Sequence, residues 1–250
     1  MTKDRQSAVV VTGCAGAVGR AICCAFRDVG DHVIGTDLPT SDAQDVDEFV
    51  PADLASVARD NAVRELFLRD LLVAIGDRPL RVLINNAATQ ELYSTADLPA
   101  DSWARTLDVN LSAAFFLVQG LLSELAEAKG SVINVASVHA QATKPKFVAY
   151  ATSKAALVGM TRALAVDVGA HVRVNAICPA AIDTPMLRAG FEGEEGALGK
   201  LKSFHPVGHI GGVEDVASAC VYLADSSSSF VNGAILVLDG GILGRLHDPL

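Results

Sequence analysis

The sequence predicts an α/β protein with a doubly wound parallel sheet and helices on both of its faces. Two observations carry this prediction. Short runs of consecutive apolar residues alternate along the chain with longer stretches of helical periodicity, a pattern typical of parallel strands that are buried on both sides. No linker, repeat or change of composition divides the 250 residues, half of which are apolar. We therefore expect a single domain over 1–250 with one large core.

In the first part of the chain, each expected strand is a short apolar run and each expected helix is a longer amphipathic stretch. The first strand leads through a glycine-rich turn into a helix that ends near Val29. The elements expected here are strands at Ala8–Thr12, His32–Thr36 and Glu48–Ala52, a helix at Leu54–Ala74 and a strand at Arg81–Asn85. The segment between the second and third strands is too short for a full crossover helix, which indicates an abbreviated sheet edge.

The second part of the chain repeats this alternation. A long helix is expected from Asp101 to about Ala128, with Asp101 or Ser102 as its N-cap. The elements expected after it are a strand at Ser131–Ala136, a helix at Ala149–Val168, a strand at Val172–Cys178, a helix near Val213–Ala224 and a strand near Ala234–Leu238. The stretch at 185–206 has no clear periodicity and is expected to be irregular.

Charge and composition exclude several classes of protein. The formal net charge of −9 and the pI near 5.1 argue against binding to nucleic acid or to an anionic membrane surface. No apolar run reaches the roughly 18 residues of a membrane span, and the N-terminus has no signal-peptide core. The five cysteines, together with His139 and His205, show no metal-ligand spacing. We expect a cytoplasmic protein with reduced thiols and no metal.

The glycine-rich turn after the first strand, Thr12-Gly-Cys-Ala-Gly-Ala-Val-Gly19, predicts a dinucleotide site. Glycines allow a tight turn and let the backbone approach a pyrophosphate at a helix N-terminus, where free N–H groups favour anions. The spacing of Gly13, Gly16 and Gly19 does not match Gly-x-Gly-x-x-Gly. An ordinary glycine-rich turn is therefore the alternative if the glycines are considered alone.

Asp37, at the end of the second strand, predicts NAD as the cofactor. An acidic side chain at this position accepts hydrogen bonds from the adenosine ribose hydroxyls and repels a 2′-phosphate. The following loop, Leu38–Glu48, contains four acidic residues and no lysine or arginine. Arg20, on the first helix, is the one cation nearby that could serve a 2′-phosphate.

Tyr150-Ala-Thr-Ser-Lys154 is the candidate for catalysis, although a tyrosine and a lysine four residues apart occur by chance in many surface helices. Ser137 ends a strand thirteen positions earlier, and ligands bind at the carboxyl ends of parallel strands. A lysine ammonium one helical turn away stabilises a phenolate and lowers the pKa of tyrosine from about 10. Tyr150 is then the general acid/base, and the Ser137 hydroxyl bonds the substrate oxygen.

Taken together, these motifs resemble the short-chain dehydrogenase/reductase family from about Ala8 to Gly241. The glycine turn is similar to the family's Thr-Gly-x-x-x-Gly-x-Gly, and the pair of Tyr150 and Lys154 to its Tyr-x-x-x-Lys. The other matching stretches are Asp53-Leu54, Asn85-Asn-Ala-Ala88, Asp108-Val-Asn110, Asn175 through Pro179 with Thr184, and Leu238-Asp-Gly-Gly241. Three family glycines are alanine here: Ala17, Ala88 and Ala180.

The resemblance implies a Rossmann fold with a seven-stranded sheet of order 3-2-1-4-5-6-7, in dimers or tetramers packed through the two long helices. It implies that Asn110 positions a water that relays protons to Lys154, and that Lys154 also holds the nicotinamide ribose. The expected cofactor-binding residues are Gly13, Gly16, Ala17, Val18, Gly19, Asp37, Leu38, Asp53, Leu54, Asn86, Ala87, Ala88, Tyr150, Lys154, Pro179, Ile182 and Thr184.

The expected activity is NAD-dependent interconversion of a secondary alcohol and a ketone. One alternative is a 3-oxoacyl-[acyl-carrier-protein] reductase that uses NADPH, against which the acidic loop and the lack of an obvious basic docking face argue. Another is a non-catalytic nucleotide sensor, against which the presence of Ser137, Tyr150 and Lys154 argues.

The expected substrate is a small polar hydroxy or keto compound. Besides Ser137 and Tyr150, Gln90 and His139 are the expected substrate contacts, because both resemble substrate-contacting residues of the family's 3-hydroxybutyrate dehydrogenases. The basic residue that those enzymes carry three before the tyrosine is Phe147 here, and Gln90 and His139 remain open to a simpler interpretation as generic loop residues. The glycines of the 185–206 stretch predict a mobile substrate lid, with Glu192, Glu194 and Glu195 in solvent.

Overall fold

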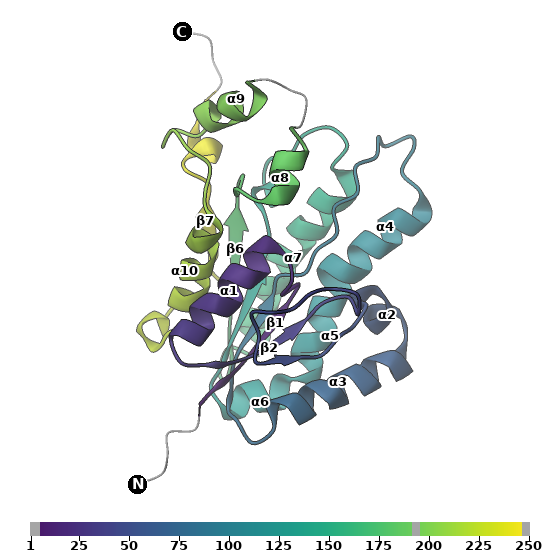
Figure 1. Cartoon of the computed structure of the whole chain (residues 1–250), viewed down its shortest axis with the longest axis vertical. Helices are drawn as coiled ribbons and strands as arrows, with labels where there is room; N and C mark the ends of the chain where they lie inside the picture. The colour runs from purple at the N-terminus through teal and green to yellow at the C-terminus, as the bar shows by residue number, and fades with distance from the viewer. Residues whose placement is uncertain (1–5, 192–195, 247–250) are drawn as a thin grey trace.

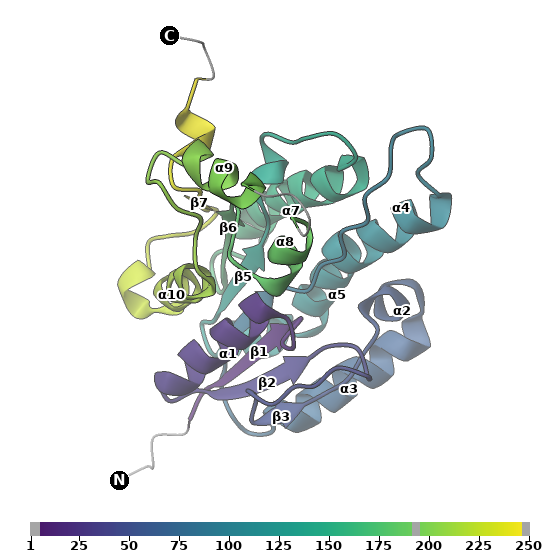
Figure 2. The same ribbon diagram turned by 45° about the horizontal axis from the view of Figure 1, so that its top comes forward.

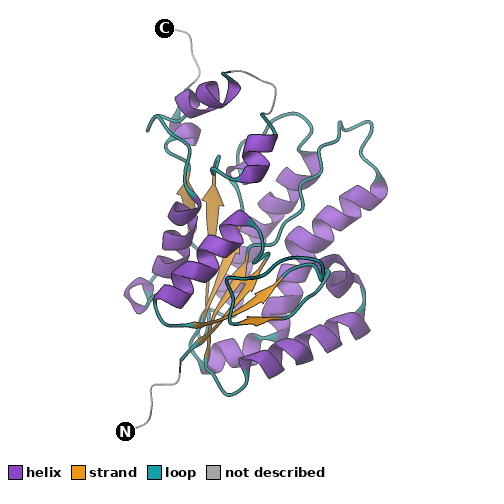
Figure 3. Ribbon diagram, in the orientation of Figure 1, coloured by secondary structure: helices purple, strands orange, loops and turns teal. Residues whose placement is uncertain are grey.

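The computed structural model describes residues 6–191 and 196–246. Its centre is a parallel sheet (Figures 1 and 3). Within the described residues the sheet has seven strands in the order β3-β2-β1-β4-β5-β6-β7, which confirms the expected order. The strands are β1 (Ala8–Thr12), β2 (His32–Thr36), β3 (Glu48–Phe49), β4 (Leu80–Asn85), β5 (Ser131–Val135), β6 (Arg173–Pro179) and β7 (Ile235–Leu238).

Helices cover both faces of the sheet (Figure 2). The helices are α1 (Ala17–Asp28), α2 (Leu54–Arg59), α3 (Asn61–Ile75), α4 (Ala100–Leu107), α5 (Ala113–Gly120), α6 (Leu122–Glu127), α7 (Val148–Asp167), α8 (Pro185–Ala189), α9 (Ala197–Phe204) and α10 (Val213–Ala224). In the described part of the chain, none of these helices is long and apolar enough to cross a membrane.

The alternation of side chains along β1 explains why one sheet supports two cores. Val9 and Val11 point into a cluster formed with α1 and α10, which includes Phe26 of α1. Ala8 and Val10 point to the other face, into a cluster formed with α2, α3, α5 and α7. Successive strand residues face opposite sides, so a strand buried on both faces has to be apolar throughout. All five residues of β1 are buried.

Two expected elements in the first half are shorter in the structure. The expected strand at Glu48–Ala52 pairs with β2 only over Glu48 and Phe49. The expected helix at Leu54–Ala74 is broken at Asp60, whose backbone is extended at φ −116° and whose carboxylate accepts from the N–H groups of Ala62 and Val63. Asp60 therefore ends α2 and caps α3, since a carboxylate at an N-cap satisfies amides that lack partners inside the helix.

The helix expected from Asp101 to Ala128 is also interrupted. It begins at Ala100 with Pro99 as its N-cap, so the expectation of Asp101 or Ser102 as the cap is wrong. Asp101 lies instead in the first turn, where a carboxylate favours the helix dipole. A π-helical turn at Asp108–Ser112 separates α4 from α5, and a break at Leu121 precedes α6.

The carboxyl ends of the strands all lie at one edge of the sheet, because the strands are parallel. The α8 and α9 segments extend beyond this edge, on the side of the molecule toward the C-terminus (Figure 1). The irregular stretch expected at 185–206 thus contains two short helices. The expectation of solvated side chains at Glu192, Glu194 and Glu195 falls outside the described residues.

Candidate active site

The glycine-rich turn is shaped by backbone contacts that only glycine permits. Gly13 has φ +68°, and a Cβ atom there would lie 2.8 Å from Cα of Ala87. A Cβ on Gly19 would lie 2.0 Å from the carbonyl oxygen of Gly13, so the turn folds tightly onto the start of α1. Gly16 is the N-cap of α1, exposed and without a side-chain cap. The first N–H groups of α1 therefore face an open cradle that suits a dinucleotide pyrophosphate.

Thr12 joins this cradle to the end of β4. Its hydroxyl accepts hydrogen bonds from the backbone N–H groups of Asn86 and Ala87, both at 2.9 Å. The Asn86 side-chain amide donates back to the carbonyls of Thr12 and Gly13 at 3.0 and 3.1 Å. These bonds place the expected cofactor residues Asn86 and Ala87 against the glycine turn. Sequence reasoning did not assign Thr12 this role, although it begins the motif.

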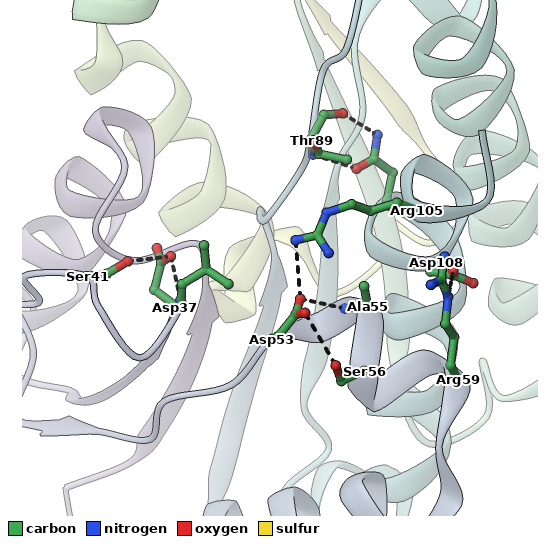
Figure 4. A network of polar contacts seen from close by, with 11 residues as sticks. Asp37, Ser41, Asp53, Ala55, Ser56, Arg59, Thr89, Arg105 and Asp108 are labelled. Carbon is green, nitrogen blue, oxygen red and sulfur yellow. Dashed lines mark hydrogen bonds and ion pairs between the residues drawn. The ribbon is translucent and has the colours of Figure 1, made fainter. Parts of the chain in front are cut away.

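Asp37 follows β2, and its side chain lies next to Ser41 (Figure 4). Its carboxylate accepts three hydrogen bonds, from the N–H of Leu38 at 2.8 Å, the hydroxyl of Ser41 at 3.0 Å and the N–H of Ala15 at 3.0 Å. A carboxylate has about four acceptor positions, so three donors orient it and leave room for a ribose hydroxyl. Nothing in the sequence pattern signalled the contact of Ser41. The side chain of Leu38 is 42% exposed beside it.

Asp53 and Leu54 lie at the start of α2 and take different roles. Asp53 is the N-cap: its carboxylate accepts from the N–H of Ala55 at 3.1 Å and from the hydroxyl of Ser56 at 3.3 Å (Figure 4). Arg105 of α4 lies 3.5 Å from the same carboxylate. The side chain of Leu54 is buried in the core beneath α2.

Ser137, Tyr150 and Lys154 converge beyond the end of β5. The Ser137 hydroxyl bonds the Tyr150 phenol, and it also accepts from the N–H of His139 at 3.2 Å. Lys154, only 2% exposed, donates to the carbonyl of Val135 at 2.7 Å. Its Nζ atom lies 5.7 Å from the centre of the Tyr150 ring. The three residues that sequence reasoning chose for catalysis are thus neighbours.

Burial sets the protonation of this group. It lowers the pKa of Lys154 from 10.5 to about 8, because the interior disfavours the charged ammonium. It raises the pKa of Tyr150, and the hydrogen bond from Ser137 offsets this only in part. The expectation that Lys154 lowers the pKa of Tyr150 is therefore not met in this structure, since burial of the phenol is the larger effect.

Asn110 lies in the π-helical turn and holds two segments beside Tyr150. Its side chain accepts from the N–H of Thr89 at 2.8 Å and donates to the Thr89 carbonyl at 3.0 Å. It also donates to the hydroxyl of Ser153 at 3.0 Å, and that hydroxyl donates to the Tyr150 carbonyl at 2.7 Å. Ser153 is a link that sequence reasoning missed, although it lies inside the Tyr150-to-Lys154 motif.

The end of β6 closes the site from the opposite side. The Pro179 carbonyl lies 3.5 Å from the Ser137 hydroxyl. Ile182 forms an isolated parallel bridge with Gly211, and the Thr184 hydroxyl accepts from the N–H of Leu187 at 3.1 Å. Pro179 therefore lies next to Ser137, while Ile182 and Thr184 are held by Gly211 and by the start of α8.

His139 and Gln90 differ in how firmly they are held. The His139 ring stacks on Phe147 with 4.4 Å between centroids, and its edge faces Tyr150 at 5.7 Å. Its Nδ1 atom lies 2.8 Å from the hydroxyl of Thr143, and burial lowers its pKa. Gln90 is exposed on the loop after β4. His139 is thus held beside Tyr150, whereas Gln90 is exposed to solvent.

The described residues contain no cluster of three or more histidine, cysteine or acidic side chains that could hold a metal ion. Cys178 of β6, close to Lys154, is fully buried, and burial raises the pKa of its thiol. It is therefore an inert, protonated thiol rather than a nucleophile.

Comparison with known proteins decides the family. A family model described as enoyl-(acyl carrier protein) reductase, within the short-chain dehydrogenase/reductases, matches residues 13–243. The chain belongs to the short-chain dehydrogenase/reductase family. Among its relatives are the D-threitol dehydrogenase of Mycolicibacterium smegmatis, 31% identical over 93% of this chain and 91% of the relative, and the NAD-dependent glycerol dehydrogenase of Listeria innocua, 30% identical over 93% and 92%.

Solved structures of the family superpose on this short-chain dehydrogenase/reductase along nearly its whole length. The ligand-free aldohexose dehydrogenase of Thermoplasma acidophilum gives a TM-score of 0.89 at 29% identity, covering 98% of this chain and 97% of that one. A blue fluorescent protein from a metagenomic library, in complex with NADPH, gives 0.83 at 30% identity, covering 95% and 98%. The family therefore includes members that bind either nicotinamide cofactor.

The three alanines at family glycine positions fit this dehydrogenase without backbone strain. Among the described residues other than glycine, only Lys129 and Lys146 have positive φ. Ala17, Ala88 and Ala180 therefore have backbone conformations that an L-residue adopts freely. Ala17 is the first residue of α1, where its methyl group suits a helix.

Proposed function

We propose that this chain is an NAD(H)-dependent oxidoreductase that interconverts a small polar secondary alcohol and the corresponding ketone. The observation that carries the proposal is the convergence of Ser137, Tyr150 and Lys154 beyond β5. The glycine-rich turn follows β1 at the same edge of the sheet, and its tight fold supports a dinucleotide site there. Proton-transferring groups next to a nucleotide cradle are what hydride-transfer chemistry needs from the protein.

In the proposed reaction, bound NAD⁺ supplies the hydride acceptor. The Tyr150 phenolate takes the hydroxyl proton of the alcohol, and the Ser137 hydroxyl hydrogen-bonds the substrate oxygen. Burial lowers the pKa of Lys154 to about 8, which still leaves the ammonium as the main form at pH 7. Its charge favours the phenolate whose formation burial opposes. Asn110 holds the Thr89 loop and, through Ser153, the first turn of α7, so it fixes Tyr150 relative to the end of β4.

Asp37 supports NAD as the preferred cofactor. Its carboxylate is oriented by three donors at the end of β2, and the loop from Leu38 to Glu48 offers no basic side chain to a 2′-phosphate. A fixed negative charge at this position repels that phosphate. We also propose cofactor roles for Gly13 through Gly19, which form the glycine-rich turn, and for Asp53 and Thr184, whose positions match the family's motifs.

The substrate assignment is supported by His139 and by the relatives. The imidazole of His139 is held against Tyr150 by its stack on Phe147, and the pKa lowered by burial favours a neutral ring that offers one donor and one acceptor. The named relatives act on D-threitol, glycerol and aldohexoses, all small polyhydroxylated compounds. We propose the same class here, with Gln90 as a second contact and α8 and α9 as a lid.

Steady-state kinetics with a substrate panel tests this function. Initial rates are measured with NAD⁺ and NADP⁺ on D-threitol, glycerol, aldohexoses and small hydroxy acids, and on a 3-hydroxyacyl thioester. We expect a polyol or hydroxy acid to be the best substrate and NAD⁺ to be preferred by about tenfold or more in kcat/KM. A thioester preferred with NADP⁺ would instead establish the alternative, a 3-oxoacyl-[acyl-carrier-protein] reductase.

Tyr150→Phe is the matched control for this panel. Loss of the phenol proton should lower kcat by about a hundredfold or more, because it removes the general acid/base. NADH binding, followed by its fluorescence, should persist. Near-wild-type turnover by Tyr150→Phe would remove Tyr150 from the proposed chemistry.

A further inference from the structure

Arg20 bridges two segments on either side of the proposed adenosine site. It lies in the first turn of α1, directly after Gly19. Its Nε–H donates to the carbonyl of Ala15 at 3.0 Å, and one terminal nitrogen donates to the carbonyl of Asp42 at 2.8 Å. The other terminal nitrogen lies 3.8 Å from the carboxylate of Asp45. One guanidinium therefore ties the glycine turn to the acidic loop that follows β2.

These are the two segments that hold Asp37. The N–H of Ala15, in the glycine turn, donates to one carboxylate oxygen of Asp37. The hydroxyl of Ser41, in the acidic loop, donates to the other. Arg20 donates hydrogen bonds to the backbone carbonyls of Ala15 itself and of Asp42, the residue next to Ser41. Arg20 thus holds the two donors, Ala15 and Ser41, in place relative to each other without contacting Asp37 itself.

We propose that Arg20 is a positioning residue for cofactor selection, and that it holds Asp37 in the orientation that selects NAD over NADP. The inference rests on the proposed NAD preference and names a residue that sustains it. It also reverses the role suggested by sequence alone, in which Arg20 is the cation available to a 2′-phosphate. Turning Arg20 toward a phosphate would break its bonds to Ala15 and Asp42 and leave Asp45 without this cation.

We call these contacts of Arg20 the brace. The charge of the acidic loop explains why the loop needs it. The loop from Leu38 to Glu48 carries four acidic residues and no basic residue of its own. Like charges at such spacing repel one another, so the loop needs a cation from elsewhere to stay close to the glycine turn. Cofactor selection is a difference between two affinities, and a displaced Asp37 would lose its ribose contact while it repels a 2′-phosphate less effectively.

Arg20→Met tests the brace, because methionine keeps an unbranched side chain but removes the charge and the donors. Dissociation constants for NADH and NADPH are measured by fluorescence titration of the wild type and the variant. If Arg20 is a brace, the NADH constant rises by about threefold to tenfold, the NADPH constant does not rise, and discrimination falls. If Arg20 binds the 2′-phosphate, NADPH weakens more and discrimination rises. An unchanged ratio, or an equal loss of both affinities, would also overturn the inference.

Arg27→Met is the matched control. Arg27 lies on the same helix two turns later and pairs with Asp47 of the same loop at 3.4 Å. Asp47 lies six residues beyond Ser41, so this pair is remote in sequence from the donors to Asp37. Its removal should leave the ratio of the two constants within about twofold of the wild type, which is within ordinary surface effects. A drop in discrimination equal to that of Arg20→Met would show a general effect of loop charge and overturn the brace.

Ser41→Ala removes one of the three donors to Asp37 and leaves the contacts of Arg20 in place. It therefore serves as the second variant if Arg20→Met does not fold. It should lower discrimination in the same direction, and an unchanged ratio would count against the inference. The wild-type affinities show separately whether the proposed cofactor preference itself fails. A wild type that binds NADPH as tightly as NADH would overturn the cofactor assignment and the brace together. A wild type that prefers NADH, with a ratio unchanged by Arg20→Met, would overturn the brace alone.

Discussion

At the scale of one residue, burial of the Lys154 ammonium lowers the stability of the folded protein. Burial lowers its pKa from 10.5 to about 8. Below pH 8 the folded protein holds a buried charge, which costs about 3 kcal/mol by the size of the shift. Between pH 8 and 10.5 the unfolded chain keeps the proton and the folded chain does not, so this cost declines and stability rises with pH. The bond to the Val135 carbonyl offsets part of the cost.

Lys154→Met should therefore stabilise the cofactor-free protein at pH 7 while abolishing turnover. After subtraction of the lost hydrogen bond, we expect a gain of about 2 kcal/mol in the free energy of unfolding at pH 7 and a smaller one at pH 10. Denaturant titration at both values measures it, with the exposed Lys200→Met as the control that should show neither gain nor trend. A gain of equal size at pH 7 and pH 10 would mean that Lys154 does not titrate in this window.

Among the glycines that the structure describes, Gly19 has the closest neighbour to an added Cβ atom. A Cβ on Gly19 would lie 2.0 Å from the Gly13 carbonyl oxygen, whereas at Gly16 the nearest neighbour is 3.5 Å away. Gly19→Ala should lower the free energy of unfolding by at least about 1–3 kcal/mol, because the atoms it meets are backbone. Gly16→Ala should cost less than about 1 kcal/mol, as a weaker N-cap. Thermal unfolding of the two variants measures this difference. Equal melting temperatures would contradict the close approach of Gly19 to the Gly13 carbonyl.

The elements also show what sequence could foresee. The bounds of β1, β2 and α10 were predicted because each is a compact apolar or amphipathic run. The π-helical turn at Asp108–Ser112 was missed because every residue in it is compatible with an α-helix. The short helices α8 and α9 were hidden by the glycines around them, which weaken a helical signal.

The same division holds within the site. Tyr150, Lys154 and Ser137 were found from a motif with ordered spacing, and the structure brings them together. The contact of Ser41 with Asp37 could not be found, because a short polar side chain in a loop has no pattern that reports its partner. The direction of the Tyr150 pKa was misjudged because burial is a property of the folded molecule and a motif does not encode it.

For the whole molecule, a hydrophobic face formed by the π-helical turn, α5 and α7 supports the proposed homo-oligomer. Phe115 is 38% exposed and contacts Phe116 edge to face at 5.5 Å. The hollow of about 380 Å³ on this face is lined by Leu111, Ser112, Phe115, Phe116, Ala156 and Met160. An exposed aromatic side chain next to partly exposed aromatic and methionine side chains is typical of association surfaces.

Phe115→Asp should dissociate the assembly, because a carboxylate buried between subunits would lack a partner. We expect the wild type to sediment at a multiple of 26.0 kDa and the variant at the monomer mass. Leu66→Asp, which replaces an exposed leucine on α3, should leave the mass of the assembly unchanged. A wild type that is monomeric at micromolar concentration would contradict the proposed face.

The π-helical turn also fixes the rotational phase of the helices on either side of it. A π turn holds one residue more than an α turn, and each α-helical residue advances the helix by about 100°. Removing one residue between Asp108 and Ser112 would therefore rotate α4 and α5 against each other by about that angle. Either Asn110 would keep its bonds to Thr89 and Ser153, or α5 would keep its buried face toward the sheet. The extra residue therefore allows Asn110 to keep its bonds while α5 keeps its buried face toward the sheet.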